Sequence, residues 1–338
     1  MINIALVGYG YWGPNLARNI DACSSTHLHT VCDLNPAAEA RVKTYHPNAK
    51  FVSDFDAVLA DSTIDAIVIA TPVTSHAPLA IAAFQAGKHV LVEKPLSESS
   101  EAAAKVVAAS KAAGKVLLVD HTFCYQGATR KVKELVDSGR LGKLFYFDSE
   151  RVNLGLFQTD VSVLWDLAVH DLSILSFWHA ELPTTISCTG AAHLEGHPVN
   201  MCHMNMKYPS GFTADISVNW LSPVKLRRIL LGGSDNMVLF DDLDPVEKIK
   251  IYDRGVTMPE AQGSGNAGPL AYRRTGDVWM PQFSLAEALQ EEIKHFAACI
   301  QGTEIPATGG EMALTLVRQL EAADESMRQG GAPVQFAQ

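Results

Sequence analysis

Apolar residues follow two different patterns along the chain. In the first 120 residues, short runs of consecutive apolar positions alternate with helical patterns. The runs are 2–7, 27–34, 65–72 and 89–95, and helical patterns such as 78–88 and 98–115 lie between them. Short continuous apolar runs are typical of parallel strands that are covered on both faces. Their alternation with helices predicts a doubly wound α/β sheet.

From about residue 143 the apolar residues alternate with polar ones instead. The clearest case is 211–221, and 143–153, 199–209, 225–233 and 236–240 resemble it. This period of two predicts an antiparallel sheet with one face packed on helices. Helical patterns follow at 284–302 and 310–331, and 260–277 reads as a loop. We therefore predict one domain over 1–120 and another over 121–338, with the last helices packing back on the first domain.

Composition excludes several classes of protein. Hydrophobic residues make up 47% and charged residues 19% of the 338 positions, as in a globular protein. No apolar run approaches the roughly 20 residues of a membrane span, and a net charge of −10 argues against nucleic acid as a partner. The 6 cysteines form no CxxC pair, which predicts neither disulfides nor a metal site and favours a cytoplasmic location.

A glycine-rich turn carries the first chemical signal. Gly8-Tyr9-Gly10-Tyr11-Trp12-Gly13 follows a predicted strand and opens a predicted helix, and Asp33 ends the next strand. Glycines in this setting let the backbone approach a pyrophosphate, and the helix N-terminus supplies N–H groups. Asp33 would bind the adenosine ribose hydroxyls and repel a 2′-phosphate. The pattern predicts NAD rather than NADP as the cofactor.

A charged triplet ends the apolar run at 89–92. Glu93, Lys94 and Pro95 fall at the carboxyl end of a predicted strand, where doubly wound sheets bind their ligands. Pro95 keeps Lys94 out of the helical region and is compatible with a cis bond. A lysine held there can donate a hydrogen bond to a substrate oxygen. A surface lysine after a strand is the structural alternative.

The second half supplies a candidate partner for this lysine. Residues 161–178 have helical apolar spacing, and Asp166 and His170 lie one turn apart on the opposite face. A carboxylate one turn from an imidazole can orient it for proton transfer. Asp171 falls within the apolar arc, so we expect it to be hydrogen-bonded and structural.

Together these motifs resemble the Gfo/Idh/MocA oxidoreductase family over essentially the whole chain. The most specific block is 70–95, beside the glycine-rich turn and Asp166-x-x-x-His170. The resemblance implies an N-terminal Rossmann domain and a C-terminal α/β domain with a large open, mainly antiparallel sheet. It also implies NAD-dependent oxidation of a carbon-bound hydroxyl, with His170 as the base, Asp166 as its orienter and Lys94 polarising the hydroxyl. The roles of His170 and Lys94 can be exchanged. Cofactor contacts are implied for Thr71, Pro72, His76, Glu93 and Lys94.

The substrate is expected from a narrower resemblance. Residues 151–155, 163–175 and 219–233 look like the branch that oxidises the 3-hydroxyl of UDP-linked N-acetylated hexosamines, of the UDP-N-acetylglucosamine type. That product would feed a PLP aminotransferase for lipid A or surface polysaccharide. A UDP group needs cations for its diphosphate and an aromatic surface for uracil. The candidate substrate contacts are Tyr125, Arg151, Asn153, Lys225, Arg227 and Trp279.

Two alternatives stay open. An enzyme of this fold acting on a free sugar or on a cyclitol such as myo-inositol would not need the basic residues near 225. A non-catalytic dinucleotide-dependent sensor or repressor would need only the cofactor site, whereas intact Lys94, Asp166 and His170 favour an enzyme. One sheet face stays uncovered in the second domain, and relatives join such faces, so a homotetramer is expected.

Overall fold

Six parallel strands form the first sheet, in the order β3-β2-β1-β4-β5-β6. The computed structural model describes residues 1–155, 157–159, 161–257 and 272–336, and it divides the chain into two compact units. The first unit comprises Met1–Gln126 and Leu285–Glu321, and the second comprises Gly127–Ser284 and Ala322–Gln338. The division falls at 126/127, and the segment 285–321 returns to the first unit.

The first unit has helices on its parallel sheet, as the apolar runs predict. Its strands are β1 (Ile2–Val7), β2 (Thr26–Cys32), β3 (Lys50–Val52), β4 (Ala66–Ile69), β5 (His89–Glu93) and β6 (Leu117–Asp120). Its helices are α1 (Gly13–Ala22), α2 (Ala37–Tyr45), α3 (Phe55–Ala60), α4 (Val73–Gln85), α5 (Ser100–Ala113), the 3₁₀ turn η1 (Thr122–Tyr125) and α8 (Ala288–Ile300). All four residues of β4 and of β6 are buried, which explains why these strands read as continuous apolar runs.

The second unit contains a nine-stranded sheet in the order β14-β13-β12-β11-β7-β10-β9-β8-β15. Its strands are β7 (Leu144–Leu154), β8 (Thr185–Ala191), β9 (Met201–Lys207), β10 (Thr213–Asn219), β11 (Leu221–Gly233), β12 (Met237–Asp241), β13 (Ile249–Thr257), β14 (Tyr272–Trp279) and β15 (Val334–Gln335). Its helices are α6 (Gly127–Asp137), the π turn η2 (Leu164–Ala168) and α7 (Val169–Trp178). Helix α9 (Gly310–Arg328) belongs partly to each unit.

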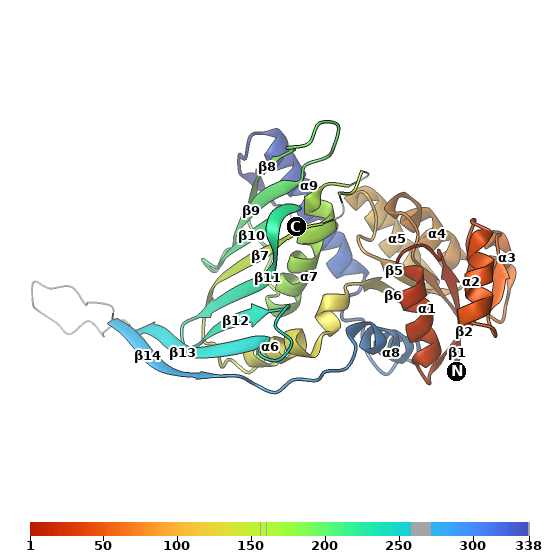
Figure 1. Cartoon of the computed structure of the whole chain (residues 1–338), viewed down its shortest axis with the longest axis horizontal. Helices are drawn as coiled ribbons and strands as arrows, with labels where there is room; N and C mark the ends of the chain where they lie inside the picture. The colour runs from red at the N-terminus through yellow and green to blue at the C-terminus, as the bar shows by residue number, and fades with distance from the viewer. Residues whose placement is uncertain (156, 160, 258–271, 337–338) are drawn as a thin grey trace, which may run out of the picture. The chain divides into compact units, whose positions relative to one another are not determined.

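One face of this sheet is covered by helices (Figure 1). Trp178 of α7 packs edge-on against Phe147 and Phe240, with ring centroids 6.1 and 5.9 Å apart. Along β9 the residues facing the helices are buried, whereas His203 on the other face is exposed. The sheet is antiparallel except where β7 and β10 pair in parallel. The prediction of a loop at 260–277 is partly wrong, because 272–277 belongs to β14. Residues 260–271 lie outside the described residues.

Candidate active site

The glycine-rich turn joins β1 to α1 in the first unit. Gly8 has φ = +96°, a conformation that favours glycine, and a Cβ there would collide with the carbonyl of Ala70. A Cβ on Gly13 would collide with the carbonyl of Gly8, so both glycines are needed for the close packing of the turn. By contrast, Gly10 is exposed and a Cβ there would meet no atom within 4 Å. The space over Gly10, beside the N-terminus of α1, fits a pyrophosphate group.

Asp33 follows β2 and is held in place by two backbone groups. Its Oδ2 accepts from Tyr9 N at 2.5 Å and its Oδ1 accepts from Asn35 N at 2.7 Å. These bonds fix the carboxylate beside the glycine-rich turn, where the adenosine ribose of a dinucleotide lies in this fold. The geometry therefore fits NAD. Tyr11 and Trp12 of the turn are 89% and 36% exposed, so they remain accessible to a cofactor.

Lys94 lies just past the carboxyl end of β5, as predicted. Its backbone N–H donates to Glu93 Oε2 at 3.0 Å, and the Lys94–Pro95 peptide is cis. His76 of α4 is only 2% exposed and its two ring nitrogens contact the carbonyl oxygens of Pro95 and Thr71 at 2.9 and 2.8 Å. Burial lowers the pKa of His76. His76 therefore joins the segment after β4 to the segment after β5, which is a role in positioning Lys94 rather than an exposed cofactor contact.

Thr71 and Pro72 lie where β4 passes into α4. Thr71 accepts a hydrogen bond from the Ser75 hydroxyl at 2.7 Å, and Pro72 is the residue that precedes the helix. Both positions are at the carboxyl end of β4, next to the strand that carries Lys94. The predicted cofactor residues of the first unit thus gather along one edge of its sheet.

Asp166 and His170 lie where a π turn passes into α7 in the second unit. The sequence predicts a regular α-helix here, but 164–168 form a π turn, a wider coil that is frequent at functional sites. Asp166 Oδ2 accepts from Trp220 Nε1 at 3.3 Å, and His170 O accepts from the Ser173 hydroxyl at 2.7 Å. Trp220 is 1% exposed, so this indole holds the Asp166 carboxylate from inside the unit.

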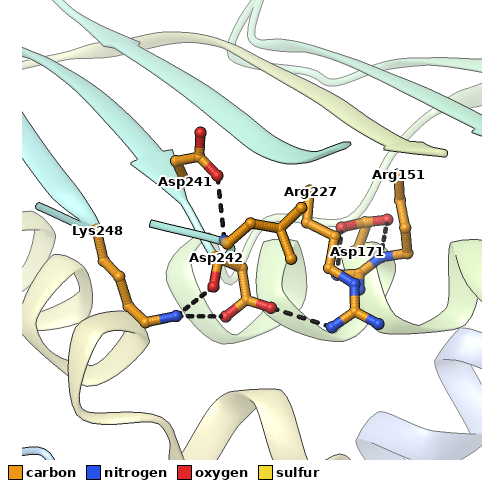
Figure 2. A network of polar contacts seen from close by, with 7 residues as sticks. Arg151, Asp171, Arg227, Asp241, Asp242 and Lys248 are labelled. Atoms are coloured by element: carbon orange, nitrogen blue, oxygen red, sulfur yellow. Dashed lines mark hydrogen bonds and ion pairs between the residues drawn. The ribbon is translucent and has the colours of Figure 1, made fainter. Parts of the chain in front are cut away.

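Two of the predicted phosphate-binding arginines are engaged in ion pairs (Figure 2). Arg151 is 4% exposed and binds Asp171 through Nε and Nη2 at 2.8 and 2.9 Å. Asp171 is 1% exposed, which confirms its predicted structural role. Arg227 lies opposite Arg151 in the β7–β11 ladder and pairs with Asp242 at 3.2 Å.

Lys248 also contacts Asp242 (Figure 2). Burial alone would raise the pKa of Asp242, but the charges of Lys248 and Arg227 hold it below its ordinary value. Arg151 and Arg227 therefore already have carboxylate partners, and their assignment to a substrate diphosphate is not supported by this geometry. Asn153, the last residue but one of β7, lies on the same face as Arg151 and is partly exposed, and Lys225 is exposed.

Both predicted stacking residues are placed elsewhere. Tyr125 is 1% exposed, its hydroxyl lies 3.0 Å from Thr308 Oγ1, and it cannot stack on a base. The ring of Trp279 lies 4.3 Å from the guanidinium of Arg140. Through the paired strands β13, β12 and β11, Trp279 is in register with Phe147 of β7. Trp220 instead comes one residue after the register partner of Val152. Along β7, Phe147 and Val152 are roughly 17 Å apart at 3.3 Å per residue. Trp279 is thus remote from Asp166.

Other features bear on binding and location. Within the described residues no cluster of His, Cys, Asp and Glu could hold a metal ion. No helix in the same part of the chain is long and apolar enough to cross a membrane. All 6 cysteines are buried and unpaired to one another.

The fold and these groups define a nicotinamide-dependent oxidoreductase with a Rossmann domain. Residues 2–121 match the oxidoreductase family with NAD-binding Rossmann fold, Gfo/Idh/MocA, and residues 129–238 match the GFO/IDH/MocA C-terminal domain. The chain belongs to the Gfo/Idh/MocA family of oxidoreductases, and its cofactor is NAD.

Similar proteins span between 73% and 100% of the chain. The uncharacterized oxidoreductase YdgJ of Escherichia coli K12 is 29% identical over 262 residues, which is 73% of each chain. Inositol 2-dehydrogenase of Rhizobium meliloti is 27% identical and covers 92% of each chain. The structure of GenD2 from gentamicin A biosynthesis in complex with NAD has a TM-score of 0.82 at 21% identity, over 100% of this chain and 97% of GenD2. This last likeness shows the fold.

Some residues of the site escape the sequence pattern. Trp220 reads only as one apolar position of an alternating strand, and nothing in the sequence pairs it with Asp166. The predicted site also does not include Asp120, the register partner of Glu93, or Glu292, whose carboxyl adjoins Asp120, although a sequence signal exists for each. Asp120 ends a buried strand as Glu93 does, and Glu292 interrupts the apolar stripe of Leu289 and Phe296.

Proposed function

We propose that this protein oxidises a secondary hydroxyl of a polyhydroxylated substrate, of the sugar or cyclitol class, with NAD as the hydride acceptor. The observation that carries the proposal is the presence, in one Gfo/Idh/MocA chain, of Lys94 at the carboxyl end of β5 and of Asp166 and His170 at the start of α7. A sensor that only binds the dinucleotide would not need these three polar residues.

Each residue has a distinct role in the reaction. His170 takes the proton of the substrate hydroxyl, and Asp166, held by the Trp220 indole, keeps the imidazole in the right orientation. Lys94 donates a hydrogen bond to a substrate oxygen, polarises the hydroxyl and stabilises the alkoxide as it forms. The roles of Lys94 and His170 can also be exchanged. NAD, when bound, supplies the redox chemistry by accepting the hydride.

The finer proposal is that the substrate is a UDP-linked N-acetylated hexosamine, oxidised at its 3-hydroxyl. It is supported by the resemblance of 151–155 and 219–233 to that branch of the family. Because Arg151 and Arg227 are paired with Asp171 and Asp242, the diphosphate charge would fall to Lys225. In the same proposal the protein is a cytoplasmic homotetramer, and its product passes to a PLP aminotransferase.

A cyclitol or free sugar is the second candidate, and the internal pairing of the arginines favours it. A substrate without phosphate leaves Arg151 and Arg227 to their structural partners. Inositol 2-dehydrogenase is also the name of a relative that matches 92% of this chain. The two candidates share the catalytic residues and differ only in what the rest of the pocket must bind.

Product analysis separates these candidates. The purified protein is incubated with NAD and either UDP-N-acetylglucosamine, with an aminotransferase and glutamate to draw the oxidation forward, or myo-inositol and free hexoses. A UDP-linked 3-amino sugar detected by mass spectrometry supports the finer proposal. NADH formation with inositol or a free sugar supports the second candidate. NAD binding with no turnover on either set contradicts the dehydrogenase and favours a sensor. Light scattering at micromolar concentration tests the tetramer, which a monomer contradicts.

A further inference from the structure

Three carboxyl groups meet beside Lys94 in the first unit. Glu93 and Asp120 are register partners at the ends of the parallel strands β5 and β6, so their side chains leave the same face of the sheet. The third carboxyl belongs to Glu292 of α8, the helix that packs against η1 and α1. Asp120 is 2% exposed and Glu292 is fully buried. We call Glu93, Asp120 and Glu292 the carboxyl cluster.

Hydrogen-bond donors are distributed unequally over the carboxyl cluster. Asp120 accepts from Trp12 Nε1 at 3.3 Å, from Thr122 N at 3.1 Å and from the Thr122 hydroxyl. Glu93 Oε2 accepts the N–H of Lys94 at 3.0 Å, whereas Glu93 Oε1 meets no donor among the described residues. Neither oxygen of Glu292 meets a donor in the part of the chain that the structure describes. Two carboxyl groups that face one another can hydrogen-bond to each other only while one of the two carries a proton.

The pKa values agree with this geometry. Burial, and then the neighbouring Asp120, raises the pKa of Glu93 and of Glu292 well above the ordinary value. Asp120, with three donors, is the member best suited to carry the negative charge. Burial and the neighbouring carboxyl groups thus favour the protonated forms of Glu93 and Glu292.

Few other charges face the carboxyl cluster. Lys94 lowers the pKa of Glu93, in opposition to the effect of burial. His121 is 1% exposed, and burial lowers its pKa to about 4, so it is neutral. On η1, Cys124 adjoins Glu292, and burial raises the pKa of Tyr125 well above 10. Tyr125 is therefore also neutral at pH 7.

The elements that carry Glu292 and its support add no compensating cation. Helix α1 packs against α8, and its Arg18 pairs at 2.6 Å with Glu287, the residue that precedes α8. Further along α8, His295 contacts Glu304 rather than the carboxyl cluster. The charge of the carboxyl cluster is therefore balanced mainly by Lys94. A second cation placed nearby would favour loss of a proton from the carboxyl cluster.

The cofactor brings such a cation to this edge of the sheet. Asp33 fixes the adenosine end at β2, and a dinucleotide crosses the switch point between β1 and β4. Its nicotinamide end then reaches the side of β4, β5 and β6, whose last strand ends in Asp120. The nicotinamide ring is a cation in NAD⁺ and neutral in NADH.

We propose that the carboxyl cluster exchanges a proton with solvent according to the charge of the nicotinamide: it releases a proton when NAD⁺ binds and keeps it when NADH binds. The O–H bond of a cluster carboxyl, with Glu292 as the main donor, breaks heterolytically. The electron pair stays on the carboxylate and the proton goes to buffer, so no redox partner is needed. The proposal rests on the NAD-dependent function and adds a means by which the first unit favours the oxidised cofactor.

Thermodynamic linkage between proton release and NAD⁺ affinity makes the proposal quantitative. If NAD⁺ binding releases a proton, NAD⁺ must bind more tightly as pH rises, by up to about tenfold in Kd per pH unit for release of one full proton. NADH binding should not show this dependence. Proton release on NAD⁺ binding should then exceed that on NADH binding by between about 0.3 and 1 proton.

Calorimetry of the purified full chain measures this difference directly. NAD⁺ and NADH are each titrated at one pH in phosphate and in Tris, whose ionisation enthalpies differ, and the change in apparent enthalpy gives the protons exchanged. The same titrations are made with Glu292→Gln, which keeps the shape of the side chain but cannot ionise. The matched control is Glu291→Gln, the neighbouring partly exposed residue that pairs with Lys294. A thermal unfolding scan verifies that each variant is folded.

The outcomes are distinct. A larger proton release with NAD⁺ than with NADH, lost in Glu292→Gln and kept in Glu291→Gln, supports the proposal. Equal proton exchange for NAD⁺ and NADH in the unmodified protein overturns it, and this arm needs no variant. A difference that persists in Glu292→Gln also overturns it, because another group such as Lys94 would then release the proton. Failure of both nucleotides to bind contradicts the cofactor assignment itself, and the proposal with it.

Discussion

The two units differ in how their charged residues are used. In the first unit, Asp33 and Lys94, together with Glu93 and Asp120 of the carboxyl cluster, lie at the carboxyl ends of parallel strands, where ligands bind in this fold. In the second unit, Arg151 and Arg227 face the helix-covered side of the sheet and are paired with carboxylates of the same unit. Charged residues therefore indicate ligand binding in the first sheet and internal stability in the second.

The difference arises from the geometry of the two sheets. Parallel strands connected by helices bring all their carboxyl ends to one edge, so the polar residues after successive strands converge. Antiparallel strands place polar residues along the whole face, and an arginine on the covered face is tolerated only with a partner. Charge at the end of a buried parallel strand is thus better evidence for a site than charge within an antiparallel strand.

The largest expected effect tests the candidate catalytic residues of both units. Lys94→Ala and His170→Ala should each lower turnover by about two to four orders of magnitude, because a proton-transfer or alkoxide-stabilising group is lost. Steady-state kinetics on the substrate identified by product analysis measures it. Lys105→Ala, which removes an exposed lysine paired with Glu101, is the control and should leave turnover unchanged. Near-normal turnover in either catalytic variant would refute its assignment.

The next effect tests whether the arginines of the second unit are structural. Arg151→Leu should reduce the free energy of unfolding by about 3 to 5 kcal/mol, because it leaves the Asp171 carboxylate buried without its partner. Arg228→Ala, which removes an exposed arginine paired with Asp241, should cost less than about 1 kcal/mol. Urea denaturation compares the two. Similar costs would show that Arg151 is not a buried structural residue.

A smaller effect tests the adenosine end of the first unit. Asp33→Ala should weaken NAD binding by about 10- to 100-fold, as expected for loss of hydrogen bonds to a charged group. Binding of NADP should weaken less or improve, since a repelling carboxylate is removed. Calorimetric titration of both nucleotides gives the ratio. An unmodified protein that prefers NADP would contradict the role of Asp33.

The carboxyl cluster also predicts how stability depends on pH. Glu292 has a raised pKa when folded, so its contribution to stability is complete below its unfolded pKa of about 4.5 and is lost as pH rises through the folded pKa. Glu292→Gln should therefore be more stable than the unmodified protein at pH 9, with the advantage shrinking toward pH 5. Thermal unfolding at these two pH values tests the sign. A pH-independent difference between the two proteins would mean that Glu292 does not titrate with a raised pKa.

The smallest effect concerns Trp220 in the second unit. Trp220→Phe keeps an aromatic ring but removes the N–H that Asp166 accepts, at a cost of about 1 kcal/mol, or roughly fivefold in turnover. In the proposed mechanism Asp166 acts through His170, so the pH profile of kcat should shift as well. A structural role alone would lower stability and leave the pH profile in place.

The sequence alone determined the fold class and the cofactor. Period-two and continuous apolar patterns distinguish the two sheets because side-chain direction follows backbone geometry directly. The glycine-rich turn, Asp33 and Lys94 could be found because each follows a buried strand whose end must lie at the ligand edge. Asp171 was correctly separated from Asp166 by its place on the apolar arc of one helix.

Only the tertiary structure decided which charges and rings are already engaged. The pairs Arg151–Asp171 and Trp220–Asp166 join residues 20 and 54 positions apart, so no local period reveals them. The burial of Tyr125, the distance of Trp279 from Asp166 and the place of Glu292 beside Asp120 depend likewise on how distant segments pack. Local patterns record which face a side chain takes, whereas its partner and its protonation depend on segments that only the fold brings together.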